Sequence, residues 1–266
     1  MKVGIAGLGA IGRAVARKLH QGAIPKAELA GVVVRDRGKA QAFLNEIGCK
    51  APILSIVELA AKADVVLECA PPAAMVEIAT PVLTAGKKLM VLSAGMLLRH
   101  PELIALAKEH GGQIVVPTGA LIGFDAVSAA AEGEIRSVSM ITRKPVKGLM
   151  GAPYLVKNGI EIEGLTEPKR VFKGNAREAA AGFPENVNVA AALSLAGIGP
   201  DRTTIEIWAD PGVQRNIHRV VVEADSARFE MSIENVPSEN PKTGRITALS
   251  ALAALRKMTA PLRVGT

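Results

Sequence analysis

The sequence predicts an α/β protein in which a doubly wound parallel sheet is followed by an α+β domain with a mainly antiparallel sheet. In residues 1–117, short apolar runs alternate with segments whose apolar residues recur at helical spacing, which is typical of βαβ units. Beyond Pro117 several apolar runs lie close together in the chain, as in antiparallel sheets. We therefore predict a first domain, 1–117, and a second domain, 118–236. A C-terminal helix, 237–266, is expected to complete the first domain.

The individual elements follow from the same patterns. In the first domain we expect strands at 2–6, 29–34, 64–70, 88–93 and 113–117, and helices at 13–19, 38–47, 57–61, 75–85 and 101–109. In the second we expect helices at 125–131 and 188–197 and strands at 135–142, 169–172, 203–209, 218–223 and 228–233. The short connections between the last three strands predict an antiparallel meander. Helical spacing over 243–258 predicts the C-terminal helix.

The first strand leads into a glycine-rich turn, Gly7-Leu8-Gly9-Ala10-Ile11-Gly12. In this pattern the first glycine permits the turn, the second lets the backbone approach a pyrophosphate, and the third lets helix and strand pack closely. Free N–H groups at the start of the helix, in the Ala10 and Ile11 region, then bind the pyrophosphate. Glycines also occur in ordinary turns, but the strand, turn and helix context favours a Rossmann-type dinucleotide-binding domain.

The end of the second strand predicts the choice of cofactor. It carries Arg35, Asp36 and Arg37, about where an acidic residue binds the adenosine ribose. Asp36 would accept hydrogen bonds from the ribose hydroxyls and repel the extra phosphate of NADP, whereas either arginine could bind that phosphate. We predict a preference for NAD, with NADP as a slower substitute.

The strand at 64–70 ends at a double proline, Pro71-Pro72. Because proline cannot continue a sheet ladder, the chain turns outward there, and Ala70 and Pro71 are expected in a loop against the cofactor. The alternative is a simple strand terminator.

The composition favours a globular protein that binds anionic small molecules. The 266-residue chain is 49% hydrophobic, enough for a sizeable core, and has a net charge of +7. Its Lys and Arg residues are dispersed and only 3% of residues are aromatic, so we expect no nucleic-acid partner. No segment predicts a signal peptide or membrane span, so we expect a cytoplasmic protein without a membrane partner. Cys49 and Cys69 form no metal-binding pattern, so free thiols and no metal are expected.

Several segments, in order along the whole chain, resemble the L-aspartate dehydrogenases. They lie at 7–12, 117–123, 142–145 with 151–153, 174–179, 183–190, and 210–211 leading to 216–218. The resemblance implies hydride transfer from the α-carbon of L-aspartate to a nicotinamide. The product, iminoaspartate, would hydrolyse to oxaloacetate and ammonia, and the reverse reaction would be reductive amination.

The resemblance also implies roles for individual residues. The functional histidine of the family falls on His218, its nicotinamide-side backbone contact on Ala120, and its cofactor-side asparagine on Asn188. Asn186, in the same loop, is expected to bind substrate or, alternatively, to cap the following helix. A base near the amine helps the hydride to leave, and an imidazole that titrates near neutral pH suits this task. Alternatively, His218 mainly binds a substrate carboxylate.

Two carboxylates on the substrate require cationic or N–H partners. Lys144 is the candidate, with Arg215 and backbone N–H groups as alternatives.

Other functions fit the same plan. One is another amino-acid or oxo-acid dehydrogenase, of homoserine-dehydrogenase-like or dihydrodipicolinate-reductase-like plan, although the second domain lacks a His-His pair followed by lysine. Another is a non-catalytic dinucleotide-sensing protein. A long, partly apolar sheet in a small second domain predicts a homodimer.

Overall fold

The computed structural model describes residues 1–184, 187–237 and 244–265. The chain divides into two compact units, which we describe separately. Unit 1 comprises Met1–Gly119 and Thr247–Arg263, and unit 2 comprises Ala120–Ile246 and Val264–Thr266.

Unit 1 contains a five-stranded sheet in the order β2-β1-β3-β4-β5. The strands are β1 (Lys2–Ala6), β2 (Glu28–Val33), β3 (Val65–Glu68), β4 (Lys88–Val91) and β5 (Gln113–Val115). All neighbouring strands are parallel, which confirms the predicted parallel sheet. Their carboxyl ends therefore lie along one edge, where parallel sheets of this kind bind their ligands.

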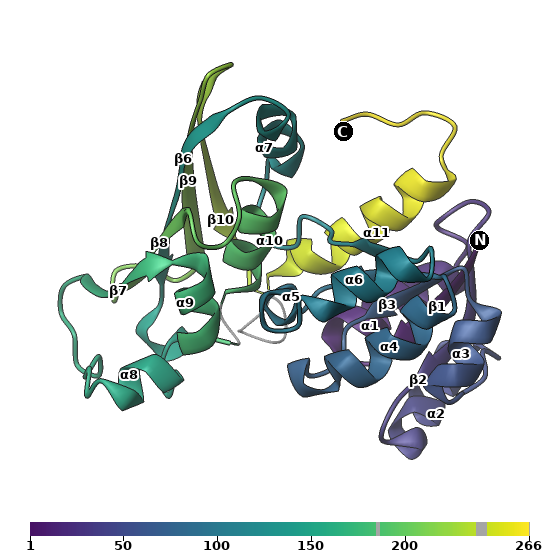
Figure 1. The fold of residues 1–266 in the computed structure, drawn as a ribbon. Helices are drawn as coiled ribbons and strands as arrows, with labels where there is room; N and C mark the ends of the chain where they lie inside the picture. Colours follow the sequence, from purple (N-terminus) through teal and green to yellow (C-terminus); the bar gives the residue numbers. More distant parts are fainter. Residues whose placement is uncertain (185–186, 238–243, 266) are drawn as a thin grey trace. The chain divides into compact units, whose positions relative to one another are not determined.

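Helices pack on both faces of this sheet (Figure 1). They are α1 (Ala10–His20), α2 (Arg37–Glu46), α3 (Ile56–Lys62), η1 (Pro72–Ala74), α4 (Met75–Thr84), α5 (Gly95–Arg99), α6 (Glu102–Glu109) and α11 (Arg245–Thr259). Alternate strand residues serve two separate cores, because successive side chains of a strand point to opposite faces. Val66 packs with α3, α4 and α6, whereas Val65 and Leu67 pack with α1, α2 and α11. The sheet is doubly wound, as predicted.

The helix expected over 237–266 is shorter in the structure. α11 ends at Thr259, and residues 260–265 are not helical. Pro261 explains the end, since proline cannot donate the backbone hydrogen bond that would continue the helix. Residues 238–243 lie outside the described part of the chain.

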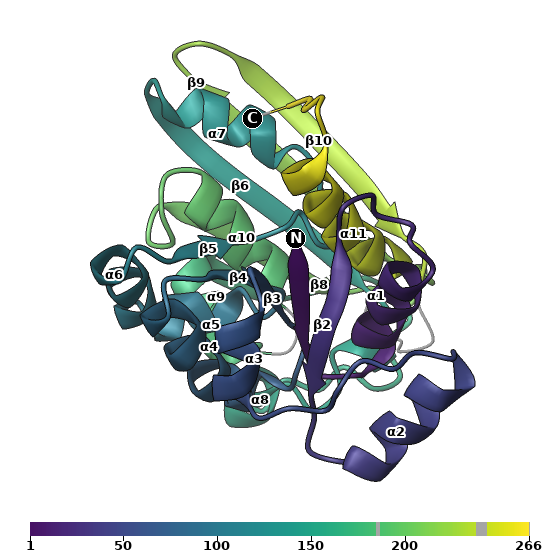
Figure 2. The same ribbon diagram turned by 90° about the vertical axis from the view of Figure 1, so that its right-hand side faces the viewer.

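Unit 2 contains a second five-stranded sheet in the order β10-β9-β6-β8-β7. The strands are β6 (Ile135–Lys144), β7 (Lys169–Asn175), β8 (Thr203–Ala209), β9 (Asn216–Ala224) and β10 (Arg228–Asn235). Only the β6–β8 pairing is parallel, so the sheet is mainly antiparallel, as predicted. Figure 2 shows β6, β9 and β10 running beside one another.

The predicted meander of the last three strands is wrong. β9 and β10 form a hairpin, but β6 lies between β9 and β8. The connection 210–215 is longer than the roughly two to five residues of ordinary hairpin loops. β8 instead pairs in parallel with β6, which the long intervening segment with β7 and three helices permits.

One face of the second sheet is buried under helices, and the other is not. The helices of unit 2 are α7 (Phe124–Ala131), η2 (Val146–Gly148), α8 (Pro153–Lys157), α9 (Ala176–Gly182) and α10 (Asn188–Ala196). Figure 1 shows α7, α9 and α10 on the same side of the sheet. The side chains of Met140, Thr142 and Lys144 belong to the buried face, whereas Ser139, Ile141 and Arg143 alternate with them on the outer face.

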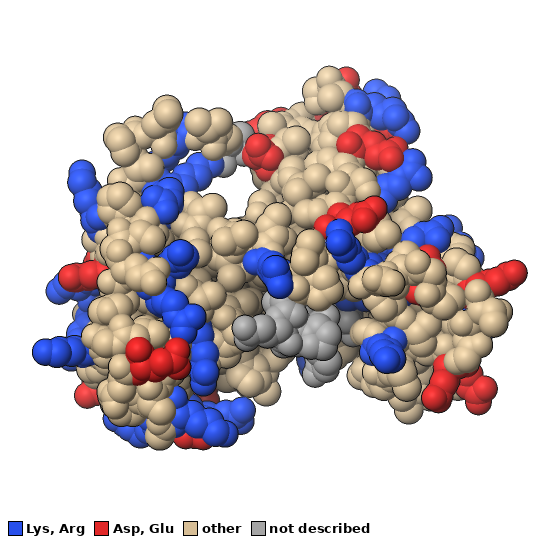
Figure 3. Space-filling view, turned by 180° about the vertical axis from the view of Figure 1, so that it is seen from behind, with Lys and Arg blue, Asp and Glu red and all other residues tan. Residues whose placement is uncertain are grey.

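Charge and hydropathy of the described residues add two observations. On the side of the molecule that Figure 3 shows, basic side chains are scattered and acidic ones lie among them. Within the described ranges, the helices are too short or too polar to cross a bilayer.

Candidate functional site

The glycine turn at the end of β1 has the geometry that each glycine predicts. Gly7 has a φ of +105°, and a Cβ there would lie 2.6 Å from the carbonyl oxygen of Cys69. A Cβ on Gly12 would overlap the carbonyl oxygen of Gly7, so α1 can pack this closely on β1 only without a side chain. At Gly9, by contrast, a Cβ would meet no protein atom within 4 Å. Packing therefore requires Gly7 and Gly12, whereas Gly9 keeps the backbone accessible to a ligand.

The start of α1 offers free N–H groups to an anion. The N-cap residue is Gly9, which has no side chain that could bind these N–H groups. The first turn of the helix contains no acidic residue. The N–H groups of the first turn, which includes Ala10, Ile11 and Gly12, have no partner within the helix. Together with the accessible backbone at Gly9, they fit the pyrophosphate of a dinucleotide.

The loop after β3 lies against this turn. The Cys69 N–H donates to the Ala6 carbonyl at 3.0 Å, and the Cys69 thiol donates to the Gly7 carbonyl at 3.0 Å. A Cβ on Gly7 would lie 2.8 Å from the Ala70 nitrogen. Pro71 follows as the N-cap of η1. The structure thus brings Ala70 and Gly7 together at the carboxyl edge of the parallel sheet.

Asp36 has a role that the sequence analysis did not identify. Its carboxylate caps α2, accepting a hydrogen bond from the Lys39 N–H at 3.0 Å, and this bond lowers its pKa. Arg37 donates to the carbonyl of Ile53 at 2.9 Å. Arg35 is exposed and makes no hydrogen bond or ion pair to any other described residue. Of the two arginines, Arg35 therefore has its guanidinium available to a ligand.

Glu68 is a buried carboxylate that the sequence analysis missed. It ends β3 and accepts hydrogen bonds from the Leu92 N–H at 3.2 Å and from the Ser93 N–H at 3.0 Å. The Ser93 hydroxyl donates to the other oxygen at 3.1 Å. Burial raises the pKa of Glu68, which these hydrogen bonds partly offset. An acidic residue in an otherwise apolar strand could have indicated this site from the sequence. The hydrogen bonds of Glu68 connect the end of β3 to the segment after β4.

In unit 2, Thr142, Lys144 and His218 come together on the buried face of the sheet. Thr142 and His218 are directly opposed on β6 and β9, and the Thr142 Oγ1 lies 3.1 Å from the His218 Nδ1. Lys144 follows on the same face of β6 and is 5% exposed. The sequence predicted Lys144 and His218 as site residues. It missed Thr142, because the predicted strand ended at residue 142, whereas β6 continues to Lys144 and places both side chains on one face.

Burial sets the charge of both basic groups. Desolvation lowers the pKa of Lys144 to about 8. Desolvation, with a contribution from the charge on Lys144, lowers the pKa of His218 to about 3. The expectation that this imidazole titrates near neutral pH is therefore wrong for the structure as it stands, because the ring is enclosed and lies near another cation.

Asn235 holds the segment that begins unit 2. Its Nδ2 donates to the Ala120 carbonyl at 2.9 Å, while its buried Oδ1 has no partner among the described residues and is available to a bound molecule. Asn235 ends β10 opposite Asn216, close in register to the pairing of Ile233 with His218. Ala120 is thus held at the end of the sheet that carries His218.

The two remaining predicted residues lie around the start of α10. Asn188 is the first residue of α10, and the N-cap is Val187, which makes no side-chain cap hydrogen bond. Asn186 lies outside the described residues. Arg215, the alternative to Lys144, is exposed and pairs with no other described residue.

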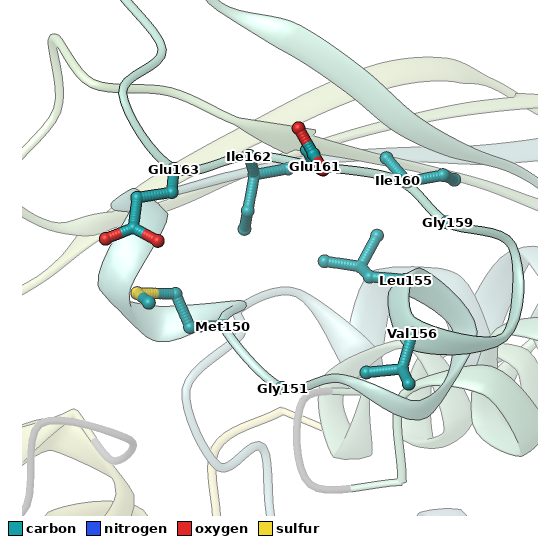
Figure 4. A pocket seen from close by; sticks show the side chains of 9 residues that line it. All are labelled: Met150, Gly151, Leu155, Val156, Gly159, Ile160, Glu161, Ile162 and Glu163. Carbon is teal, nitrogen blue, oxygen red and sulfur yellow. The ribbon is translucent and has the colours of Figure 1, made fainter.

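A pocket of about 480 Å³ lies elsewhere in unit 2 (Figure 4). Leu155 and Ile162 contribute to its apolar lining, and Glu161 and Glu163 are its charged residues. Carboxylates repel a dicarboxylate, and none of the predicted site residues lines this pocket. Among the described residues, no group of His, Cys, Asp and Glu is arranged to hold a metal ion.

A Rossmann-type unit with an open pyrophosphate site, followed by a mixed-sheet unit with buried polar groups, defines an NAD-binding oxidoreductase. Family models agree: residues 7–117 match "Homoserine dehydrogenase, NAD binding domain" and residues 125–258 match "Aspartate dehydrogenase, C-terminal". The chain belongs to the L-aspartate dehydrogenase family.

Full-length relatives show this membership. A protein of Bradyrhizobium diazoefficiens named L-aspartate dehydrogenase is 57% identical, covering 100% of this chain and 94% of its own length. L-aspartate dehydrogenase 3 of Bordetella bronchiseptica is 55% identical, covering 99% and 97%. The crystal structure of aspartate dehydrogenase from Thermotoga maritima has the same fold, with a TM-score of 0.73, 23% identity, and coverage of 100% and 99%.

Proposed function

We propose that this chain catalyses the reversible, NAD-dependent oxidative deamination of L-aspartate. The observation that carries the proposal is the 57% identity, over the whole chain, to a protein named L-aspartate dehydrogenase. L-Aspartate loses a proton from its ammonium group and a hydride from its α-carbon to become iminoaspartate. Water then converts iminoaspartate to oxaloacetate and ammonia.

The two units divide the task. In unit 1, the backbone at Gly9 and the first-turn N–H groups of α1 bind the pyrophosphate. NAD held there would supply the hydride acceptor. In unit 2, Lys144 and His218 supply the substrate-side groups, a buried amine and a buried imidazole that can each bind the substrate through a hydrogen bond. By the family resemblance, Ala120 would face the nicotinamide through its backbone and Asn188 would bind the cofactor. Asn186, the proposed substrate-binding residue, lies outside the described part of the chain.

The cofactor of choice is NAD, with NADP as a slower substitute. Asp36 stands at the end of β2 with an exposed carboxylate, whose charge repels a 2′-phosphate. Arg37 is bonded to a backbone carbonyl, which leaves Arg35 as the group that admits NADP.

Two copies of the chain associate through the outer face of the second sheet. Ile141, Ile217 and Val221 lie half-buried on this face, among charged neighbours. Apolar side chains on an outer sheet face suit a two-fold interface.

The free thiols of Cys49 and Cys69 fit a reducing compartment, so the proposed location of the enzyme is the cytoplasm.

The test is a direct assay. Purified protein with NAD and L-aspartate should produce the absorbance of the reduced nicotinamide, together with ammonia and oxaloacetate in equal amounts. L-Homoserine and D-aspartate serve as controls and should react far more slowly. Reduction with homoserine and none with L-aspartate would overturn the proposal, and so would absence of turnover with tight NAD binding.

A further inference from the structure

The hydroxyl of Thr142 lies beside one ring nitrogen of His218 on the buried face of the second sheet. Thr142 and His218 are 2% and 3% exposed, and Oγ1 and Nδ1 lie 3.1 Å apart. Among the described residues, the hydroxyl has no other hydrogen-bond partner. A buried hydroxyl hydrogen needs an acceptor, and Nδ1 is the acceptor within reach among the described residues. When the hydroxyl donates to Nδ1, that nitrogen lacks a proton.

This arrangement makes the other nitrogen a donor. A neutral imidazole without a proton on Nδ1 carries it on Nε2. His218 then offers an N–H group to a substrate oxygen and has no lone pair on Nε2 with which to take a proton. In this state it suits a carboxylate of the substrate.

Lys144 is the second basic group on the buried face that carries His218. It ends β6, two residues beyond Thr142 on the same buried face, and its charge acts on His218. We infer that Lys144 accepts the proton from the substrate ammonium and that Thr142 holds His218 as a neutral donor through Nε2. This inference rests on the proposed oxidation of L-aspartate.

The protonation behaviour of the two groups supports this division. The pKa of Lys144, about 8, gives it a neutral fraction at neutral pH and a strong tendency to accept a proton. The pKa of His218, about 3, keeps its ring neutral throughout the same range.

The proton and the electron pair that leave the substrate each have an acceptor. Neutral Lys144 Nζ takes a proton from the α-ammonium group, leaving a neutral amine on the substrate and an ammonium on Lys144. The nitrogen lone pair then forms the C=N bond as the α-hydrogen leaves with its electron pair to NAD. Lys144 later returns its proton to solvent.

The neighbouring elements carry few other charged groups among the described residues. On β8, Lys144 pairs with Ala209, and the following Asp210 binds Arg143 Nη1 at 3.0 Å. On β9 the titratable group of the buried face is His218. Of the helices over this face, α10 has no ionisable side chain, and α7 carries Asp125. On α9, Arg177 pairs with Asp201 and Glu178 caps the helix with Asn175.

Nitrogen NMR of the wild-type enzyme tests the tautomer without any substitution. The chain has four histidines, so a histidine-labelled sample gives a simple spectrum, and His218→Gln assigns the signal. We expect the Nε2–H tautomer from pH 6 to pH 9. It should persist in Thr142→Ser and give way to a mixture in Thr142→Val. A wild-type ring protonated on Nδ1, or on both nitrogens, overturns the inference.

Kinetics of Lys144→Arg tests the proton acceptor. Arginine keeps the positive charge but stays protonated, so kcat should fall by about 10²-fold or more while KM for L-aspartate changes little. Lys147→Met, at an exposed position nearby, is the matched control and should behave as wild type. NAD binding and the thermal unfolding temperature verify that each variant is folded.

Rescue of Lys144→Ala by added primary amines extends the test to a smaller side chain. The rate should rise in proportion to the concentration of neutral amine. In the wild type, kcat/KM should fall as the pH drops through about 8, and in the rescued variant the fall should follow the pKa of the added amine. Near-normal kcat in Lys144→Arg, or no rescue of a folded Lys144→Ala, overturns the role of Lys144 as proton acceptor but not the proposed function. A wild type that does not oxidise L-aspartate overturns the proposed function as well.

Discussion

At the scale of single residues, the chemistry of unit 2 depends on burial. Lys144 and His218 are both basic side chains, but enclosure on the covered face of the second sheet lowers the pKa of each, to about 8 and about 3. Desolvation penalises the charged form of both groups, and the charge on Lys144 further disfavours the charged form of His218. Near neutral pH, a fraction of Lys144 is therefore neutral, and the imidazole ring of His218 is neutral.

His218→Ala should lower kcat by about 10² to 10³-fold, because the variant loses a hydrogen-bond donor in an enclosed site. NAD binding, measured by fluorescence of the reduced cofactor, should remain near the wild-type value, since unit 1 holds the dinucleotide. A loss of turnover below about tenfold would place the essential group elsewhere.

Asp36 should decide between the two cofactors. Replacement by serine keeps a side-chain oxygen that can cap α2 while it removes the charge that repels a phosphate. We expect Asp36→Ser to lose or invert the preference for NAD in steady-state kinetics with both cofactors. Asp36→Ser with Arg35→Ala should then bind NADP less tightly than Asp36→Ser alone. A wild type that prefers NADP would contradict this account.

The sequence suggested candidate site residues but not their protonation state. Lys144 and His218 were candidates from the chain, and the structure places both on one buried face. The pKa of His218 could not be predicted, because it depends on helices that cover the sheet face and on a strand neighbour distant in sequence. The helix cap made by Asp36 could have been predicted, since an aspartate directly before a helix is a common N-cap.

At the scale of elements, the three glycines of the first turn are not equivalent. Gly9→Val should leave the unfolding temperature near that of wild type, because a side chain there meets no protein atom within 4 Å, yet it should abolish NAD binding. Gly12→Val is the matched variant. Its side chain would overlap the Gly7 carbonyl, so it should destabilise the fold by about 1–3 kcal/mol or more. Normal NAD affinity in a folded Gly9→Val protein would mean that the turn serves only packing.

Strand and helix periodicity located most elements of both units but not all of their neighbours. The strands of unit 1 alternate with helices, and right-handed crossovers leave few ways to order them. In unit 2 the sequence located β8, β9 and β10 and predicted the β9–β10 pairing correctly, but it paired β8 with β9 incorrectly, because periodicity does not say which strands are adjacent. The short helices α5, α8 and α9 were missed, whereas α3, of seven residues, was predicted.

At the scale of the whole molecule, we expect a homodimer. Light scattering at micromolar concentration should give twice the chain mass of 27.7 kDa. Ile141→Glu, on the outer face of the second sheet, should give the monomer mass. Ile104→Glu, at a 47% exposed position on α6, should not change the wild-type value. A monomer in the wild type would contradict the proposed interface.

The central claim is that the chain moves the α-hydrogen of L-aspartate to NAD, and L-aspartate deuterated at its α-carbon tests it most directly. Mass spectrometry should find one deuterium in the reduced nicotinamide for each oxaloacetate formed. The rate of a single turnover should be lower than with unlabelled substrate. Reduced nicotinamide without deuterium, or no reduction of NAD by a folded enzyme that binds it, would contradict the account.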